Sequence, residues 1–87
     1  MAKVDIYTSP LCGFCHAAKR LLDSKGVAFE DVPVDHDPKL RQEMTERSRR
    51  TTVPQIWICG EHIGGCDELY LLDRAGKLDG MLGLSAS

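Results

Sequence analysis

Residues 6–16 read IYTSPLCGFCH. The first residues are typical of a β-strand, Ser9-Pro10 predicts a turn, and the two cysteines that follow are expected on the first turn of a helix. Residues three apart share one helix face, so Cys12 and Cys15 can form a small disulfide or hold two thiols side by side. Backbone N–H groups without partners and the positive end of the helix dipole stabilise a thiolate there. The pattern therefore predicts redox chemistry.

The rest of the chain predicts strands and helices in the order β-α-β-α-β-β-α-α. Strands are expected over residues 3–7, 27–34, 55–59 and 62–63, and helices over residues 13–25, 38–48, 66–74 and 77–82. Residues 85–87 are expected to form a frayed tail. This order predicts an α/β fold with a four-stranded mixed sheet flanked by helices and a right-handed parallel first crossover. We expect one domain over residues 1–87.

Local signals mark several of these elements. Asp37 is a typical helix N-cap with Pro38 at the first helical position, and Pro33 near the end of the second strand indicates a sheet edge or a strand terminus. The expected core-facing residues are Phe14, Ala17, Ala18, Leu21 and Leu22 on the first helix and Leu69, Leu72 and Ala75 on the third.

Composition excludes several classes of function. The 87 residues are 43% hydrophobic and 28% charged, which is typical of a folded domain and not of a disordered chain. A net charge of -2 argues against a nucleic-acid-binding surface, which is normally basic. No apolar run approaches the length of a membrane span, and residues 1–5 lack the apolar segment of a signal peptide. We therefore expect a cytoplasmic protein without nucleic-acid or membrane partners.

Four cysteines allow three interpretations: a disulfide framework, a metal site or a redox pair. Structural disulfides are rare in a reducing cytoplasm. A zinc site would need two ligands besides Cys12 and Cys15, but Cys59 and Cys66 lack the spacing of a second C-x-x-C. We therefore expect a redox pair and no metal site, with Cys59 a small buried residue at a strand end.

Thr52-Val53-Pro54 precedes the third predicted strand. A cis bond at Pro54 would make a sharp turn that leaves the backbone N–H and C=O of Val53 free to pair with an extended peptide ligand. An ordinary trans loop proline is the other interpretation.

Gly64 to Glu68 read GGCDE and open the third predicted helix. Two glycines there expose helix N–H groups, which are a natural carboxylate site, and Asp67 could then bind an ammonium group. Asp67 could equally do no more than complement the helix dipole.

Three motifs together resemble the glutaredoxin family. They are YTSPLCGFC at 7–15, TVPQI at 52–56 and GGCDEL at 64–69, in the order and spacing of that family and, in particular, of its small bacterial glutaredoxin 3 type. The resemblance extends over nearly the whole chain. It implies a thioredoxin-like fold, a cis Pro54 and glutathione as the ligand of a groove.

The resemblance also implies roles for individual residues. Cys12 would attack mixed disulfides and Cys15 would resolve them. Phe14 would line the groove. Val53, with Thr52 and Pro54 beside it, would pair with the cysteine of glutathione. The γ-glutamyl end would be held by Gly65, Cys66 and Asp67, and the glycyl carboxylate would face Arg41. The implied activity is glutathione-dependent reduction of glutathionylated and disulfide-containing proteins by a monomer, in electron transport and cell redox homeostasis.

Two positions depart from the family pattern. Ser9 stands where many relatives have lysine, so one positive charge near the thiols is missing, and Lys19, Arg49 and Arg50 are the candidates to replace it. Gly13-Phe14 replaces the commoner Pro-Tyr and resembles the monothiol branch that binds iron–sulfur clusters. The alternative function is therefore a homodimer carrying a [2Fe–2S] cluster on Cys12 and glutathione. A domain used only for binding is a third possibility.

Overall fold

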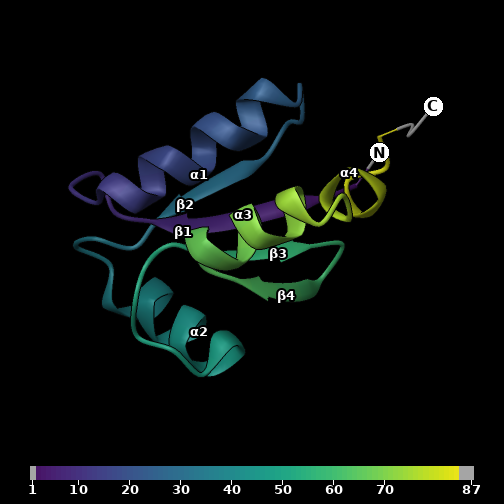
Figure 1. Cartoon of the computed structure of the whole chain (residues 1–87). Coiled ribbons are helices and arrows are strands. Elements are labelled where there is room, and N and C mark those ends of the chain that lie inside the picture. Colours follow the sequence, from purple (N-terminus) through teal and green to yellow (C-terminus); the bar gives the residue numbers. More distant parts are fainter. Residues whose placement is uncertain (1, 85–87) are drawn as a thin grey trace.

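The computed structural model describes residues 2–84 (Figure 1). Its elements are β1 (Val4–Thr8), α1 (Gly13–Ser24), β2 (Glu30–Pro33), α2 (Pro38–Ser48), β3 (Gln55–Ile58), β4 (Glu61–Gly64), α3 (Cys66–Arg74) and α4 (Leu78–Met81). The predicted order of strands and helices is confirmed. The frayed tail expected over residues 85–87 lies outside the described residues.

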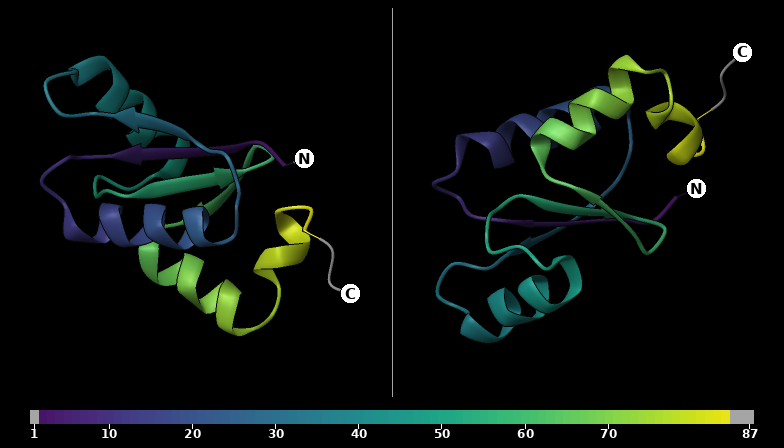
Figure 2. Two further views of the ribbon diagram at one scale, coloured as in Figure 1. Left: turned by 90° about the horizontal axis from the view of Figure 1, so that it is seen from above. Right: turned by 60° about the horizontal axis from the view of Figure 1, so that its bottom comes forward.

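The four strands form one mixed sheet in the order β2-β1-β3-β4. β1 and β2 are parallel, whereas β1 with β3 and β3 with β4 are antiparallel. β2 is therefore an edge strand, which explains how it accommodates Pro33. Helices α1 and α3 cover one face of the sheet and α2 covers the other (Figures 1 and 2).

Alternation along the central strands divides the core between the two faces. Val4 and Ile6 of β1, together with Ile56 and Ile58 of β3, pack against α1, α3 and α4. On the other face, Tyr7, Val34, Met44 and Trp57 form a smaller cluster under α2. The two central strands thus belong to both cores, and their ends position the segments that form the site.

The beginning of α2 follows the predicted signals. The Asp37 carboxylate accepts a hydrogen bond from the Leu40 N–H at 3.1 Å, and Pro38 occupies the first helical position, where its missing N–H costs nothing. Arg49 ends the helix in the left-handed conformation, with φ at 60°.

Three burial predictions were wrong. Phe14 is 66% exposed, because it lies on the first turn of α1 and it is Cys15 that faces the interior there. Ala75 is exposed because α3 ends at Arg74. Cys59 is exposed because β3 ends at Ile58, and Cys59 and Gly60, both with positive φ, form the two-residue turn to β4.

No helix within residues 2–84 has both the length and the apolar character needed to cross a membrane.

Candidate active site

The turn between β1 and α1 places Cys12 at the N-cap of the helix. The Cys12 N–H donates to the Ser9 carbonyl at 3.1 Å, and the Cys12 carbonyl accepts from the His16 N–H at 3.3 Å. Ser9 is nearly buried, and its hydroxyl donates to the Asp35 carboxylate at 2.7 Å. The serine that stands in place of a lysine therefore ties the active-site turn to the segment between β2 and α2.

The two thiols have unequal surroundings. Cys15 is fully buried, and burial raises its pKa to about 12; the Ser9 N–H, which donates to the Cys15 sulfur at 3.5 Å, opposes the rise, and the neighbouring Cys12 adds to it. Cys12 is half-buried, and its thiol contacts the Val53 carbonyl at 3.7 Å. At neutral pH, Cys15 stays protonated while Cys12 is the more accessible sulfur.

The loop before β3 lies next to Cys12. The Val53-Pro54 peptide bond is cis, as the resemblance implied, and Pro54 is buried. The Cys12–Val53 contact brings this loop to the Cys12 thiol although the two residues are far apart in the sequence.

A groove of about 200 Å³ runs between this loop and the start of α3. Its lining includes all the sequence-predicted glutathione contacts except Arg41: Phe14, Thr52, Val53, Pro54, Gly65, Cys66 and Asp67. It also includes Arg50, Gln55 and Glu68, which the motif comparison did not assign to the ligand. Arg50 was signalled by the basic run at 47–50, and Gln55 by being a polar residue at the start of an otherwise apolar strand.

Arg41 lies beside the groove and does not line it. Its guanidinium donates to the Thr51 carbonyl at 3.0 Å and lies 3.9 Å from the Asp35 carboxylate. These contacts hold the side chain next to the residue that precedes the loop at 52–54.

The second wall of the groove is the start of α3, where Glu68 joins two segments. Its carboxylate accepts from the Gly65 N–H at 2.7 Å and pairs with the Arg50 guanidinium at 2.7 Å. The pKa of Glu68 is held below its usual range, mainly by the hydrogen bond from the Gly65 N–H and secondly by Arg50. The Arg50–Glu68 pair thus links the two walls.

Two glycines allow these walls to approach each other. Gly64 has φ at 121°, and a Cβ there would collide with the Glu68 side chain. A Cβ on Gly65 would lie 3.1 Å from the Pro54 carbonyl oxygen. The GG pair is therefore needed for the fit of α3 against the cis-proline loop.

Cys66 is buried at the first position of α3. Burial raises the pKa of its thiol, and the nearby charges of Asp67, Cys12 and Glu68 raise it further. The Cys66 side chain is therefore a neutral part of the groove wall at physiological pH.

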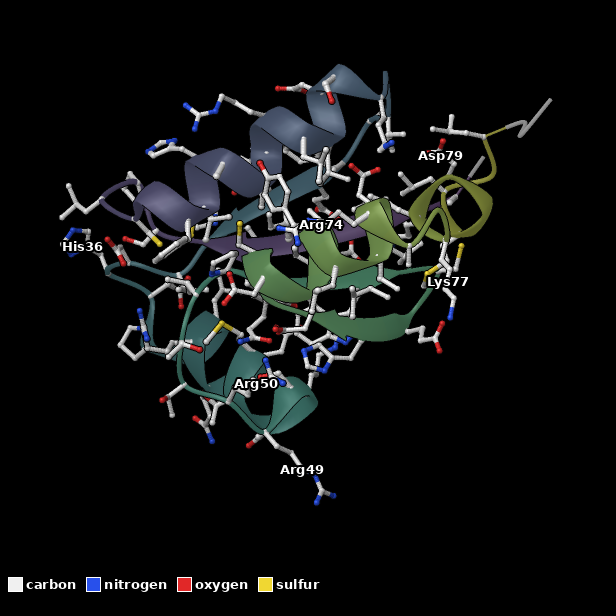
Figure 3. All side chains as sticks on the ribbon, in the orientation of Figure 1. His36, Arg49, Arg50, Arg74, Lys77 and Asp79 are labelled. Carbon is white, nitrogen blue, oxygen red and sulfur yellow. The ribbon has the colours of Figure 1, made fainter. Side chains whose placement is uncertain are left out.

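The three candidate replacements for the missing lysine charge differ in position. Lys19 is paired with Asp31 at 2.8 Å, on the β2 side of α1. Figure 3 shows that the Arg49 side chain points away from the sheet, whereas Arg50 lies between α2 and α3. Of these three, Arg50 alone lines the groove.

The geometry argues against a shared zinc site for the four cysteines. The Cys59 N–H donates to the Lys3 carbonyl at 2.7 Å, at the start of β1, whereas Cys12 follows the end of β1. Cys59 is therefore at the opposite end of the sheet. Across the described part of the chain, no three or more His, Cys, Asp and Glu side chains are grouped so that they could hold a metal ion.

Comparisons with known proteins agree with this geometry. The family model described as Glutaredoxin matches residues 4–63. The chain is 57% identical to Glutaredoxin 3 of Escherichia coli strain K12 over 82 residues, which are 94% of this chain and 99% of that protein.

Two solved structures have the same fold. The solution structure of a glutaredoxin from Brucella melitensis is similar with a TM-score of 0.84 and 51% identity, covering 94% of this chain and 89% of that one. A buckwheat glutaredoxin–glutathione complex is similar with a TM-score of 0.86 and 30% identity, covering 92% of this chain and 76% of that one.

Proposed function

The chain belongs to the glutaredoxin family of glutathione-dependent thiol–disulfide oxidoreductases, and we propose that Cys12 is its nucleophile and Cys15 its resolving thiol. The inequality of the two sulfurs supports this assignment. Cys12 is partly accessible at a helix N-cap, whereas Cys15 is buried with a raised pKa. A thiolate is the attacking species in disulfide exchange, so Cys12 acts first.

We propose that glutathione binds in the groove between the loop at 52–54 and α3. The backbone of Val53 pairs with the cysteine residue of glutathione, and the γ-glutamyl carboxylate lies at the first turn of α3, where the helix dipole favours an anion. Asp67 takes the ammonium group. Arg41, held beside Thr51, faces the glycyl carboxylate, and Arg50 adds positive charge to the groove.

The reaction on a glutathionylated protein is an exchange of sulfur partners. The Cys12 thiolate attacks the glutathione sulfur, the protein–glutathione disulfide breaks, and the protein thiolate leaves and takes up a proton. The thiolate of a second glutathione then attacks the glutathione sulfur on Cys12. Cys12 leaves as a thiolate, and glutathione disulfide is released.

Protein disulfides use both cysteines. Cys12 attacks one sulfur of the substrate and forms a mixed disulfide with the protein. Cys15 then loses its proton and attacks the Cys12 sulfur, which forms the Cys12–Cys15 disulfide and releases the substrate as a dithiol. Two glutathione molecules reduce the enzyme disulfide afterwards.

Single cysteine variants test these roles in a glutathione-coupled assay. With a glutathionylated peptide as substrate, Cys12→Ser should abolish turnover, whereas Cys15→Ser should keep much of it. With a protein disulfide as substrate, Cys15→Ser should lose most of the activity. Equal loss of the first reaction in both variants would contradict the proposal.

We propose thiol–disulfide exchange, and not transport of a [2Fe–2S] cluster, as the main function. Gly13 motivated the cluster alternative, and packing does not explain this glycine, because a Cβ on it would meet no described atom within 4 Å. The observation that favours exchange is the second thiol, because Cys15 lies on the same first turn of α1 as Cys12 and can attack a mixed disulfide formed there. The test is the visible absorption of anaerobically purified protein. We expect a colourless monomer, and a brown dimer containing glutathione would contradict this proposal.

We further propose that residues 1–87 act as one domain, as a monomer, in the cytoplasm. The reaction needs a pool of reduced glutathione, which a reducing compartment supplies. Sedimentation of the purified protein tests the monomer, and fractionation of cells tests the location.

A further inference from the structure

Gln55 is a buried amide that lies directly under the loop at 52–54. It is the first residue of β3, and its side chain is 1% exposed. Its Nε2 donates to the Thr52 carbonyl at 3.0 Å and to the Thr52 hydroxyl oxygen at 3.3 Å. Because a carbonyl oxygen can only accept, the NH₂ group of Gln55 must face Thr52, and the amide oxygen must face the other way.

That amide oxygen contacts His62. The Gln55 Oε1 lies 2.7 Å from the His62 Nε2. Since Oε1 can only accept, the imidazole must carry a proton on Nε2. The two hydrogen bonds therefore follow one another in the same direction: His62 donates to Gln55, and Gln55 donates to the Thr52 carbonyl.

The imidazole is held in place by the aromatic cluster under α2. His62 pairs with Trp57 across β3 and β4, and their ring centroids are 4.9 Å apart. The Arg47 guanidinium in turn covers the Trp57 ring at 4.4 Å. Trp57 is buried and His62 is half-buried, so packing limits the orientations of the ring.

We propose that His62, as the Nε2–H imidazole, is a positioning residue that fixes the glutathione-binding loop through the Gln55 amide. The proposal rests on the proposed function, because it takes the loop at 52–54 as the binding loop for glutathione. His62 is not among the residues that line the groove. Its hydrogen-bonded route to the ligand passes through Gln55, which itself lines the groove, and through Thr52.

Loss of the His62 donor would leave the buried Gln55 oxygen without a partner. A buried acceptor without a donor is unfavourable, so the amide would turn toward another donor and its NH₂ would leave the Thr52 carbonyl. Thr52 precedes Val53, whose backbone is the proposed pairing partner of glutathione. The Cys12 sulfur is held at the N-cap of α1, and of its surroundings it is the contact to the Val53 carbonyl that would shift with the loop.

The surroundings of His62 favour the neutral imidazole. Burial lowers the pKa of His62, Arg50 and Arg47 lower it further, and Glu68 opposes them. A neutral imidazole has one proton, so its place on Nε2 excludes a proton on Nδ1. Measuring which ring nitrogen of His62 carries the proton therefore tests the proposed arrangement directly.

The test compares His62→Met with His62→Gln in the 87-residue chain. Methionine has a similar length without a donor, whereas glutamine can direct an NH₂ group at the Gln55 oxygen. With a glutathionylated peptide, we expect His62→Met to raise KM about three- to tenfold with kcat within about twofold, because one orienting hydrogen bond is lost. His62→Gln should stay within about twofold of the wild type in both constants.

Two further measurements separate this proposal from the proposed function. The rate of Cys12 alkylation by iodoacetamide should stay within about twofold of the wild type in both variants, because the N-cap position of Cys12 is unchanged and the only contact affected is the weak one to the Val53 carbonyl. ¹⁵N NMR of the wild-type imidazole should show His62 protonated on Nε2, and this result stands even if His62→Met fails to fold. An equal rise of KM in both variants, an unchanged KM in His62→Met, or a proton on Nδ1 would overturn the positioning role. Failure of the wild type to turn over the glutathionylated peptide would instead overturn the proposed function.

Discussion

Gly65 lies against Pro54 so closely that a Cβ on Gly65 would be 3.1 Å from the Pro54 carbonyl oxygen. Both atoms in this contact are backbone or directly attached to it, so neither can move away without moving a wall of the groove. The width of the groove is therefore set by main chain.

Gly65→Ala should weaken the use of glutathione substrates. The added methyl group pushes α3 and the cis-proline loop apart, so we expect KM for a glutathionylated peptide to rise about fivefold or more, together with a loss of about 1–2 kcal/mol in the free energy of unfolding. Gly80→Ala is the matched control, because a Cβ on Gly80 meets no described atom within 4 Å. Steady-state kinetics and urea unfolding of both variants measure the difference, and equal KM values would contradict it.

Cys15 should resist alkylation at neutral pH. With its pKa raised to about 12, the thiolate fraction of Cys15 at pH 7 is on the order of 10⁻⁵. Brief treatment of the reduced protein with iodoacetamide, followed by peptide mass spectrometry, should therefore modify Cys12 and leave Cys15 unmodified. The exposed Cys59 is an internal reference for an accessible thiol. Modification of Cys15 at the rate of Cys12 would refute the inequality of the two sulfurs.

Glu68→Gln should reduce stability at neutral pH and have less effect in acid. The pKa of Glu68 is lowered in the folded state, so its contribution is present above the pKa of the unfolded chain and is lost as the pH falls through the folded value. The carboxylate is half-exposed, which limits the difference at pH 7 to about 0.5–1 kcal/mol. Urea unfolding should show this difference shrinking below about pH 4. Glu61→Gln is the control, because Glu61 is exposed. A difference in the free energy of unfolding between wild type and Glu68→Gln that did not change with pH would contradict this prediction.

Arg50→Gln should affect activity where Arg49→Gln does not. Arg50 lines the groove and pairs with Glu68, whereas the neighbouring Arg49 points to solvent (Figure 3). We expect kcat/KM for a glutathionylated peptide to fall about two- to fivefold in Arg50→Gln, because an exposed pair and a partly screened charge are lost. The loss should diminish at about 0.5 M salt. Equal effects of the two substitutions would show that only the net charge matters.

Local signals were sufficient to predict the order of elements. Asp37 and Pro38 begin α2 through contacts within one turn. The predicted bounds of α3 agree with the structure because Asp67 and Glu68 lie in its first turn and Arg74 in its last. The family motifs also predicted the cis bond at Pro54 and, apart from Arg41, they predicted residues that line the groove.

Tertiary arrangement decided what the sequence could not predict. Phe14 satisfies the apolar period of α1, but the first turn of the helix borders the groove, and so its ring is exposed. Cys59 was predicted at the end of a strand, but the register of the hairpin pairs Ile58 with Glu61 and leaves Cys59 in the two-residue turn. The His62–Gln55 contact joins adjacent strands, and no spacing rule links a histidine to a glutamine seven residues earlier.

The site is assembled from separate segments of the sequence, and this has a consequence for how the chain can diversify. Cys12, the proposed nucleophile, and its turn lie between β1 and α1, while most of the groove lining comes from the segment after α2 and from the start of α3. Substitutions in the later segments can therefore change which thiol compound is accepted without altering the reacting sulfur. Reactivity and most of the selectivity are therefore encoded in different stretches of one short chain, and Phe14 is the groove residue that shares a stretch with the reacting sulfur.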